Sequence, residues 1–400
     1  MKIKVIAVCF LILVVVTACG RRPNGSTGPI ISLPDDIVWG RESRTTAPRA
    51  TVVWRHRLSS EGQYFNHVLT EHPQGFMFGY FDRQGPVAAF SRTILDPATG
   101  TVLQRDVLEK VTPYGFCPDA IFHKEAEEIR LETDGGTLVL PQLPEAEGWF
   151  DCLLREDGVV LLGYDQAGRF ITYLDAEGEK RGIYRPEPRG PKEIFVLETY
   201  GSQERLVDLG DGLLGAYGLT IRGLIALDME TGQLVWDYHI PMEDRICSVS
   251  VGQDGIWIGG LSHDYDGVVA LLAPDGAVLR ELEHPAPVVA IGALDDRACW
   301  FMAGWGGPDG DNKVYLLEHD RLAQEVLEDI EFGRVPEVNN SLVFLNSTQG
   351  ILYQWQPGQV AQAYELPFYG EPNSTQMLGA RDDMVLIQYK NEIYAILLEQ

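Results

Sequence analysis

The chain has 400 residues, of which 45% are hydrophobic, enough for a large packed core. Its 58 acidic residues outnumber 32 basic ones, which gives a formal net charge of −26 at pH 7. A surface of this sign repels nucleic acid and disfavours adhesion to anionic lipid, so nucleic-acid binding is excluded. The acidity itself implies no partner, because net charge also keeps a protein soluble.

The amino terminus is typical of an exported protein. A short basic start precedes an apolar run at residues 5–16, which is short for a membrane span and suits a signal-peptide core. The sequence Val-Thr-Ala-Cys-Gly at residues 16–20 then resembles a bacterial lipobox. The resemblance implies that residues 1–18 are removed and that Cys19 carries the lipid. An uncleaved anchor helix with an incidental cysteine is the alternative.

The next segment, residues 19–49, is rich in Gly, Pro, Ser, Thr and Arg and lacks hydrophobic periodicity, which predicts a flexible tether. Residues 50–400 would then form one domain on the extracytoplasmic side of a bacterial membrane. Gly20 follows the lipidated cysteine, and the absence of aspartate there favours outer-membrane sorting if the host has two membranes. In a host with one membrane, the protein would face outward from the cell membrane.

The best-defined motif spans residues 223–236, Gly-Leu-Ile-Ala-Leu-Asp-Met-Glu-Thr-Gly-Gln-Leu-Val-Trp. Its first part, residues 224–227, is a short apolar run bounded by turn residues, which is typical of a buried strand. Asp228 can cap backbone N–H groups, and Gly232 accepts a positive φ. Because residues 234–236 resume a β-prone run, the motif predicts a tight hairpin.

Within this stretch, the pattern Ala-x-Asp-x-x-Thr-Gly-x-x-x-Trp resembles the repeat of quinoprotein-type β-propellers. That family includes the pyrroloquinoline-quinone (PQQ) dehydrogenases and a non-catalytic lipoprotein of the outer-membrane barrel-assembly machinery. The resemblance implies that Trp236 lies in an outer strand and packs against a neighbouring blade. An ordinary antiparallel hairpin is the alternative interpretation.

Weaker copies of the hairpin recur along the chain and predict an all-β fold, a β-propeller. The units run over residues 67–108, 116–143, 149–184, 194–240, 246–283, 288–327, 330–366 and 377–398. The last unit has about three strands, and residues 52–58 resemble the outer strand at 234–240, so we expect an amino-terminal strand to close the ring. Eight units of roughly 43 residues suit the usual blade length, with seven blades as the alternative. Residues 322–330 look helical but fall where the register places an outer strand.

Four cysteines remain besides Cys9 and Cys19: Cys117, Cys152, Cys247 and Cys299. An even number in an exported protein permits disulfides. Cys117 and Cys152 occupy comparable places in successive units and are the candidate pair. Each cysteine also lies beside or inside an apolar strand, where it can serve as a small hydrophobe. No spacing resembles a zinc site.

Signals for catalysis are absent from the sequence. The quinone dehydrogenases carry adjacent cysteines and a calcium triad, and this chain has no Cys-Cys pair and no recognisable triad, which argues against a PQQ cofactor. We find no Ser-His-Asp nucleophile motif, phosphate loop or HExxH. A pair of glycosidase carboxylates cannot be singled out among 58 acids. No catalytic residue is therefore predicted.

Two loops carry the residues most suited to binding a ligand. Residues 262–267 and 305–312 fall between the second and third strands of successive units, so we expect them side by side on one face. Their Asp-x-Asp spacing offers oxygen ligands for calcium, from Asp264, Asp266, Asp309 and Asp311. His263 and Trp305 would suit a sugar or a peptide. The alternative is two solvated turns built from turn-forming residues.

These patterns favour a membrane-anchored, extracytoplasmic lipoprotein whose propeller binds a protein or a cell-envelope polymer without catalysis. One alternative is a propeller enzyme acting on a carbohydrate or another extracellular substrate. Another is a scaffold for outer-membrane protein assembly, which requires a host with an outer membrane. The fold by itself does not choose among them, because propellers carry unrelated functions.

Overall fold

The structure is a computed structural model of the chain. It describes residues 47–58, 67–70, 72–82, 89–108, 112–113, 120–125, 128–133, 136–141, 148–155, 158–175, 179–185, 205–218, 223–239, 245–253, 255–261, 266–295, 298–304, 312–318, 324–331, 334–368 and 375–398. The signal peptide and most of the tether predicted from the sequence lie outside these ranges. Within them, no helix is long and apolar enough to cross a membrane.

The described residues form eight antiparallel sheets of four strands each. The strands of the first four sheets in chain order are β2 (His67–Leu69), β3 (Phe76–Asp82), β4 (Ala89–Leu95) and β5 (Val102–Leu108); β6 (Thr112–Pro113), β7 (Ala120–Glu125), β8 (Glu128–Thr133) and β9 (Gly136–Pro141); β10 (Gly148–Arg155), β11 (Gly158–Asp165), β12 (Gly168–Asp175) and β13 (Lys180–Tyr184); and β14 (Arg205–Gly210), β15 (Leu213–Gly218), β16 (Gly223–Asp228) and β17 (Leu234–Tyr238).

The strands of the other four sheets are β18 (Arg245–Val251), β19 (Ile256–Leu261), β20 (Gly267–Leu272) and β21 (Val278–His284); β22 (Val288–Asp295), β23 (Ala298–Ala303), β24 (Asn312–Glu318) and β25 (Gln324–Ile330); β26 (Glu337–Val338), β27 (Ser341–Asn346), β28 (Ile351–Trp355) and β29 (Gln362–Glu365); and β30 (Thr375–Arg381), β31 (Met384–Tyr389), β32 (Glu392–Leu397) and β1 (Thr51–Arg57).

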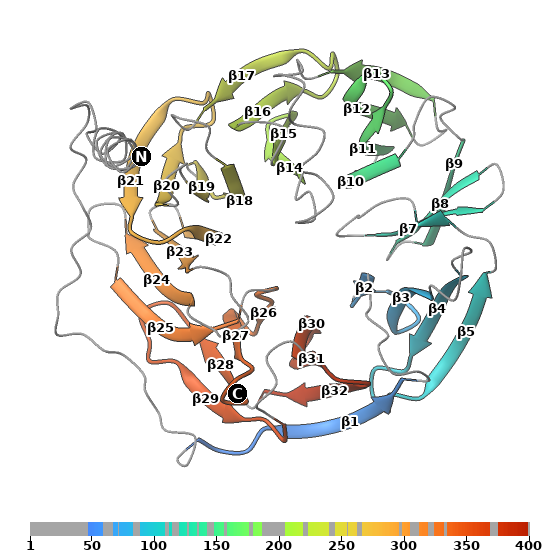
Figure 1. The fold of residues 1–400 in the computed structure, drawn as a ribbon, viewed down its shortest axis with the longest axis vertical. Helices are drawn as coiled ribbons and strands as arrows, with labels where there is room; N and C mark the ends of the chain where they lie inside the picture. The colour runs from blue at the N-terminus through green and yellow to red at the C-terminus, as the bar shows by residue number, and fades with distance from the viewer. Residues whose placement is uncertain are drawn as a thin grey trace, which may run out of the picture.

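The sheets stand around a ring as blades, with the first strand of each at the centre and the fourth at the perimeter (Figure 1). The last sheet has the order β1-β32-β31-β30, so the first strand of the described chain is its outer strand. The predicted all-β propeller, closed by an amino-terminal strand, is therefore confirmed. β25 lies in the stretch with helical appearance and is the outer strand that the register predicted.

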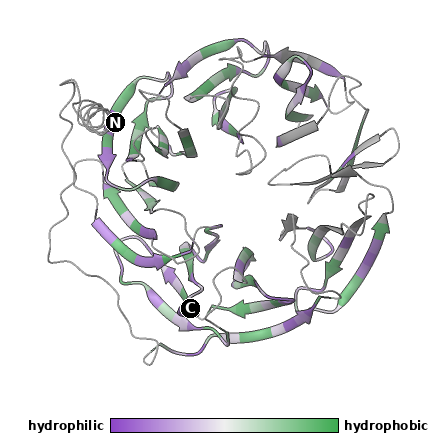
Figure 2. Ribbon diagram, in the orientation of Figure 1, coloured by the Kyte–Doolittle hydropathy of each residue, from purple (hydrophilic) through white to green (hydrophobic). Residues whose placement is uncertain are grey.

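The cores lie between neighbouring blades, because one four-stranded sheet cannot bury both of its faces alone. One cluster joins Trp257 and Leu271 of sheet β18–β21 to Phe301 and Tyr315 of sheet β22–β25. Along the outermost strands, hydrophilic and hydrophobic residues alternate, as expected for a strand with one face toward solvent (Figure 2). The perimeter is thus where unburied surface is available for other partners.

The cysteines divide into two groups. Cys152 is buried and disulfide-bonded. Cys247 and Cys299 are free thiols, and burial raises the pKa of Cys299. The predicted partner of Cys152, Cys117, falls outside the described residues, so that pairing stays a prediction.

Candidate functional site

Two hairpin turns at the perimeter have the same geometry. We call the turn between the third and fourth strands of a sheet its outer turn. In residues 96–100 and 228–232, the aspartate carboxylate accepts hydrogen bonds from the N–H and hydroxyl of the threonine three residues on. In both, the closing glycine N–H donates to the aspartate carbonyl at 2.8 Å. Gly100 and Gly232 both have φ of +66°, a left-handed conformation that favours glycine.

The first of these turns is covered by a tryptophan. Trp54 in β1 belongs to the neighbouring blade, and its indole N–H donates to the Pro97 carbonyl at 2.7 Å. A Cβ on Gly100 would collide with the Trp54 ring. Trp54 is therefore packed against the outer turn of the next sheet and is buried.

A second tryptophan does the same four blades further around the ring. Trp236 in β17 donates its indole N–H to the Pro274 carbonyl at 3.1 Å, and a Cβ on Gly276 would lie 2.7 Å from its ring. Trp236 pairs with Ala226, and Trp54 pairs with Ala395 at the equivalent place. The packing of Trp236 against a neighbouring blade is thus as the resemblance implied.

Arginine replaces tryptophan in the next blade. Arg280 pairs with Leu271 at the same register position, and its guanidinium donates to the Glu318 carbonyl at 2.8 Å. In these three sheets, this position of the outer strand fills the space over the next outer turn with a large side chain that donates to a carbonyl of that sheet. We call that space an outer cleft.

The outer cleft over residues 228–232 lacks such a side chain. The equivalent position in β13 is Gly182, which pairs with Tyr173. A Cβ on Gly182 would meet no atom within 4 Å, and neither would a Cβ on Gly232. The turn at Gly232 has the same geometry as the turn at Gly100. Trp54 covers the turn at Gly100, whereas the outer strand β13 leaves the turn at Gly232 uncovered.

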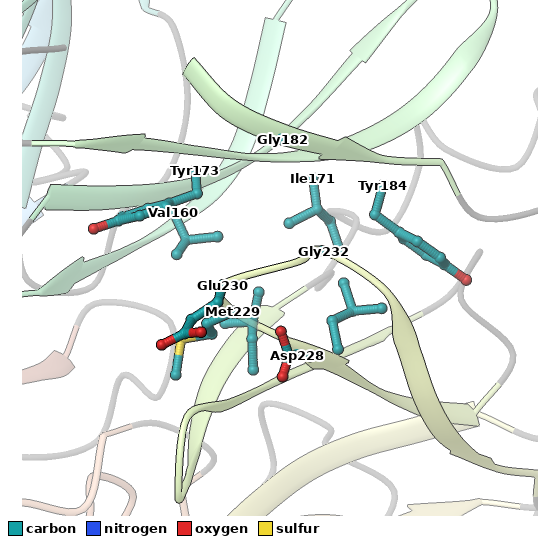
Figure 3. A pocket seen from close by; sticks show the side chains of 11 residues that line it. Val160, Ile171, Tyr173, Gly182, Tyr184, Asp228, Met229, Glu230 and Gly232 are labelled. Atoms are coloured by element: carbon teal, nitrogen blue, oxygen red, sulfur yellow. The ribbon is translucent and has the colours of Figure 1, made fainter. Parts of the chain in front are cut away.

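The space left open is a cleft of about 380 Å³, its open mouth included. Sheet β10–β13 forms one side and the outer turn with Asp228, Glu230 and Gly232 forms the other (Figure 3). Val160, Ile171, Leu214 and Leu227 form a buried apolar floor. Half-buried Tyr173, Tyr184 and Met229 line the entrance. We call this the first outer cleft.

The cleft also carries negative charge. Hydrogen bonds from the Thr231 hydroxyl and N–H lower the pKa of Asp228, so its carboxylate is charged at neutral pH. Glu230 next to it is exposed. The Met229 carbonyl corresponds in this turn to the Pro97 carbonyl that accepts from Trp54. The cleft therefore offers an apolar floor, one carbonyl acceptor and two acidic groups.

A buried ion pair ties the two sides of this cleft together at the inner strands. Asp151 in β10 accepts a hydrogen bond from the Leu206 N–H of β14 at 2.7 Å. Its other oxygen lies 3.5 Å from the Arg205 guanidinium. The side chain of Asp151 is fully buried, so this contact fixes sheet β10–β13 against sheet β14–β17.

A second outer cleft lies between β25 and the outer turn before β29. Gln324 of β25, which pairs with Leu316, borders this cleft, and a Cβ on Gly358 would meet no atom within 4 Å. In this turn the Gln359 N–H donates to the Gln356 carbonyl three residues back, as the Gly276 N–H does to Ala273, whereas the turns at Gly100 and Gly232 close over four residues. The cleft measures about 630 Å³, its open mouth included.

The described ends of the loops singled out by sequence lie on the opposite rim, between the second and third strands. Of the six candidate ligands there, His263, Asp264, Trp305, Asp309 and Asp311 fall outside the described residues. Asp266 is half-buried and directly precedes β20. The described part of the chain holds no group of three or more His, Cys, Asp or Glu placed to bind a metal ion. Calcium binding by these loops stays a prediction.

The connection from β21 to β22 separates the described ends of these two loops. A Cβ on Gly267 would collide with the Ala286 carbonyl, and the Gly304 N–H donates to the Pro287 carbonyl at 2.9 Å. His284 begins this connection, buried against the rings of Phe301 and Tyr315, and burial lowers its pKa.

Three histidines of the described chain lie in packed positions. His72 and His284 are buried, and His56 is half-buried with a pKa lowered by burial. The side chain of His67 is outside the described set. A neutral imidazole fits a packed position, which the scattered pattern in the sequence does not reveal.

No family model matches the chain, and no curated protein matches it by sequence. The structure of Sqt1 from Saccharomyces cerevisiae is similar, with a TM-score of 0.55 and 11% identity over 88% of this chain and 100% of that one. Sqt1 from Chaetomium thermophilum, bound to the N-terminus of the ribosomal protein L10, has a TM-score of 0.54 and 12% identity over 88% and 98%.

The C-terminal WD40 domain of Sif2 is similar at a TM-score of 0.51 and 11% identity, over 88% of this chain and 99% of that domain. The chain folds as a β-propeller. At such low identity these likenesses show the fold alone, and the function has to be argued from the outer clefts.

Proposed function

We propose that the protein is a lipid-anchored, extracytoplasmic propeller that binds a partner protein without catalysis, through an aromatic side chain of the partner seated in the first outer cleft. One observation carries the proposal. Gly100 and Gly232 close identical turns, and Trp54 covers the first while the second is open. The molecule's own tryptophans indicate which chemistry such a cleft accepts.

The cleft also suggests the chemistry around that aromatic residue. An indole on the floor between Ile171 and Leu227 would bury apolar surface, and its N–H could donate to the Met229 carbonyl, as Trp54 donates to Pro97. The charged Asp228 and the exposed Glu230 favour a cationic neighbour. The partner is therefore a protein segment with tryptophan beside lysine or arginine.

Location outside the cytoplasm has two supports. The lipobox-like sequence ends at Cys19, and its resemblance implies a lipidated first residue. In addition, Cys152 is disulfide-bonded, which is typical of an oxidising compartment. The host membrane that carries the anchor is the outer membrane or the cell membrane.

We also infer that the repeat is of the quinoprotein type. The support is the shared placement of Trp54 and Trp236 over the next outer turn, the packing that the resemblance implies. The motif concerns packing and carries no cofactor chemistry with it. A PQQ cofactor is accordingly not part of the proposal.

The proposal is tested by capture from native membranes with the lipidated protein as bait. Gly182→Trp supplies the missing indole from β13 and closes the cleft, with Gly182→Ala as the matched control that leaves it open. We expect one abundant envelope protein in the parent and alanine samples, strongly depleted with tryptophan. Equal capture by all three would contradict the cleft as the binding site.

Membrane attachment is tested separately with Cys19→Ala. Loss of the lipid acceptor removes the anchoring acyl chains, which bind with about 0.8 kcal/mol per buried CH₂. We expect the variant to leave the membrane fraction while its fold and its binding of the partner in detergent extracts are unchanged. Persistence in the membrane fraction would contradict lipid anchoring and leave the cleft proposal standing.

A further inference from the structure

The second outer cleft, like the first, lies between an outer strand and the outer turn of the next sheet, but its surroundings differ. It is lined by Leu316, Gln324 and Val326 of sheet β22–β25 and by Trp355 and Val360 of sheet β26–β29. Val360 is 58% exposed, a large value for a valine that borders a cleft. The cleft therefore presents apolar surface that no described side chain covers at Gly358.

The described chain enters the molecule beside this cleft. Ala47 is buried in the same cluster as Trp355 and Ala363, with Leu316 and Val326 packed against it. The chain then bonds to the outer strand, because Glu365 N–H donates to the Pro48 carbonyl and Ala50 N–H donates to the Glu365 carbonyl. Leu316, Val326 and Trp355 of this cluster line the cleft, so the described chain begins at its edge.

The direction of the chain there is also set. Arg49 forms a parallel bridge with Glu365 in β29. Pro48 and Ala47 therefore run alongside the residues before Glu365, toward Gln362 and the turn at Gly358. The described chain consequently begins on the side of β29 that faces the cleft turn.

That segment contains the residues that fill such clefts elsewhere. Residues 37–39 are Ile-Val-Trp, which matches Val-Val-Trp at 52–54 and Leu-Val-Trp at 234–236. Trp54 and Trp236 both lie over an outer turn of a neighbouring blade. From Trp39 to Ala47 the chain spans eight steps, a reach of up to roughly 28 Å. This is ample to reach a cleft whose lining Ala47 already touches.

We propose that Trp39 docks into the second outer cleft, in the place that Trp54 and Trp236 occupy over their own outer turns. The amino-terminal segment thus supplies an indole to a cleft that β25 leaves open. The turn at Gly358 closes differently from those at Gly100 and Gly232, so the proposal concerns packing against Leu316, Trp355 and Val360 and names no carbonyl acceptor.

Docking of Trp39 has a consequence for the anchored protein, which rests on the proposed lipidation at Cys19. The flexible tether shortens to the residues between Cys19 and Trp39, with an expected end-to-end distance of about 25 Å. The lipidated end of the tether then extends from the rim of the propeller that carries the outer turns. The rim of the predicted binding loops faces away from the membrane.

The test is fluorine NMR of the unlipidated Cys19→Ala chain labelled with 5-fluorotryptophan. Trp39→Phe identifies the Trp39 signal among the eight tryptophans. We expect that signal to show a solvent isotope shift well below that of free 5-fluorotryptophan. A full solvent shift in this parent spectrum overturns the proposal.

Two variants decide which cleft Trp39 occupies. Gln324→Trp places an indole in the second outer cleft from β25, and we expect it to release Trp39 to the full solvent shift. Gly182→Trp fills the first outer cleft and serves as the matched control, with an unchanged Trp39 signal. Release by Gly182→Trp in place of Gln324→Trp overturns the assignment to the second cleft. Neither result depends on partner binding, so failure here is distinct from failure of the proposed function.

Discussion

At the scale of single residues, the outer turns form a natural matched pair. Gly100 and Gly232 share φ, hydrogen bonds and position, and differ in whether a tryptophan covers them. Any residue other than glycine would be strained by the same left-handed conformation at either position. A difference between the two positions therefore reports contact with the indole alone.

This pair gives the first prediction. We expect Gly100→Ala to destabilise the protein more than Gly232→Ala, because its Cβ also collides with Trp54. Overpacking adds about 1–3 kcal/mol, on top of a left-handed cost of about 1–2 kcal/mol common to both. Urea denaturation of the two variants measures the difference. Equal losses of stability in the two variants would contradict this prediction and show that the Trp54 ring moves aside without an energetic cost.

A buried carboxyl provides a residue-scale prediction about pH. Glu331 follows β25, and its N–H donates to the Leu345 carbonyl at 2.8 Å. Burial raises the pKa of its carboxyl to about 7, while a hydrogen bond from Ser347 acts in the opposite direction. One carboxyl oxygen is buried without a hydrogen-bond partner. The folded state thus favours the protonated form.

The sign of the effect follows from this raised pKa. Stability from Glu331 is full below the unfolded pKa near 4.5 and is lost as pH rises to about 7. The loss is at most about 3 kcal/mol at 1.36 kcal/mol per pKa unit. We expect Glu331→Gln to be more stable than the parent at pH 8 and similar to it at pH 4.5. Denaturation at both pH values measures this, and parallel curves would contradict it.

At the scale of elements, the hairpins were predictable from sequence and the clefts were not. Asp-Gly and Thr-Gly turns are local signals, so the unit at 67–108 coincides with β2–β5. The resemblance between residues 52–58 and 234–240 likewise predicted that β1 closes the ring. The first inference uses residues close together in the sequence, where turn chemistry decides the structure. The second uses the repeat, because a strand with the outer-strand pattern needs a blade that lacks one.

That Gly182 leaves a cleft open can be recognised only from the packing of two neighbouring blades. The signal was present, because Gly178 stands four residues before Gly182 as Gly232 stands four before Trp236. To interpret this signal, one must know which outer turn each outer strand contacts. The order of the blades around the ring determines those contacts. The sequence instead drew attention to acidic loops, whose residues lie outside the described ranges apart from Asp266.

An element-scale prediction concerns filling the first cleft. We expect Gly182→Trp to stabilise the protein by about 0.5–2 kcal/mol, as cavity-filling substitutions commonly do. Gly182→Ala, which adds a Cβ in open space, should change stability far less. Thermal and urea unfolding of both variants measure the effect. A net loss with tryptophan would mean that Tyr173 and Tyr184 leave no room for the ring.

At the scale of the whole molecule, a rigid ring presents two unlike rims. The buried Asp151–Arg205 contact and the Trp54 and Trp236 packings fix neighbouring blades to one another. The outer clefts are gaps in that series of packings, on the rim of the outer turns. With a net charge of −26, the surface also steers basic partners toward the acidic mouth of the first cleft.

The central claim is that the first outer cleft holds an aromatic side chain of a partner protein. The most direct measurement replaces Glu230, at the cleft mouth, with a photocrosslinking amino acid in cells and identifies the crosslinked peptide by mass spectrometry. The account predicts one partner, crosslinked near a tryptophan flanked by lysine or arginine, and loss of the product when Gly182→Trp is added. The same crosslink with and without Gly182→Trp would contradict it.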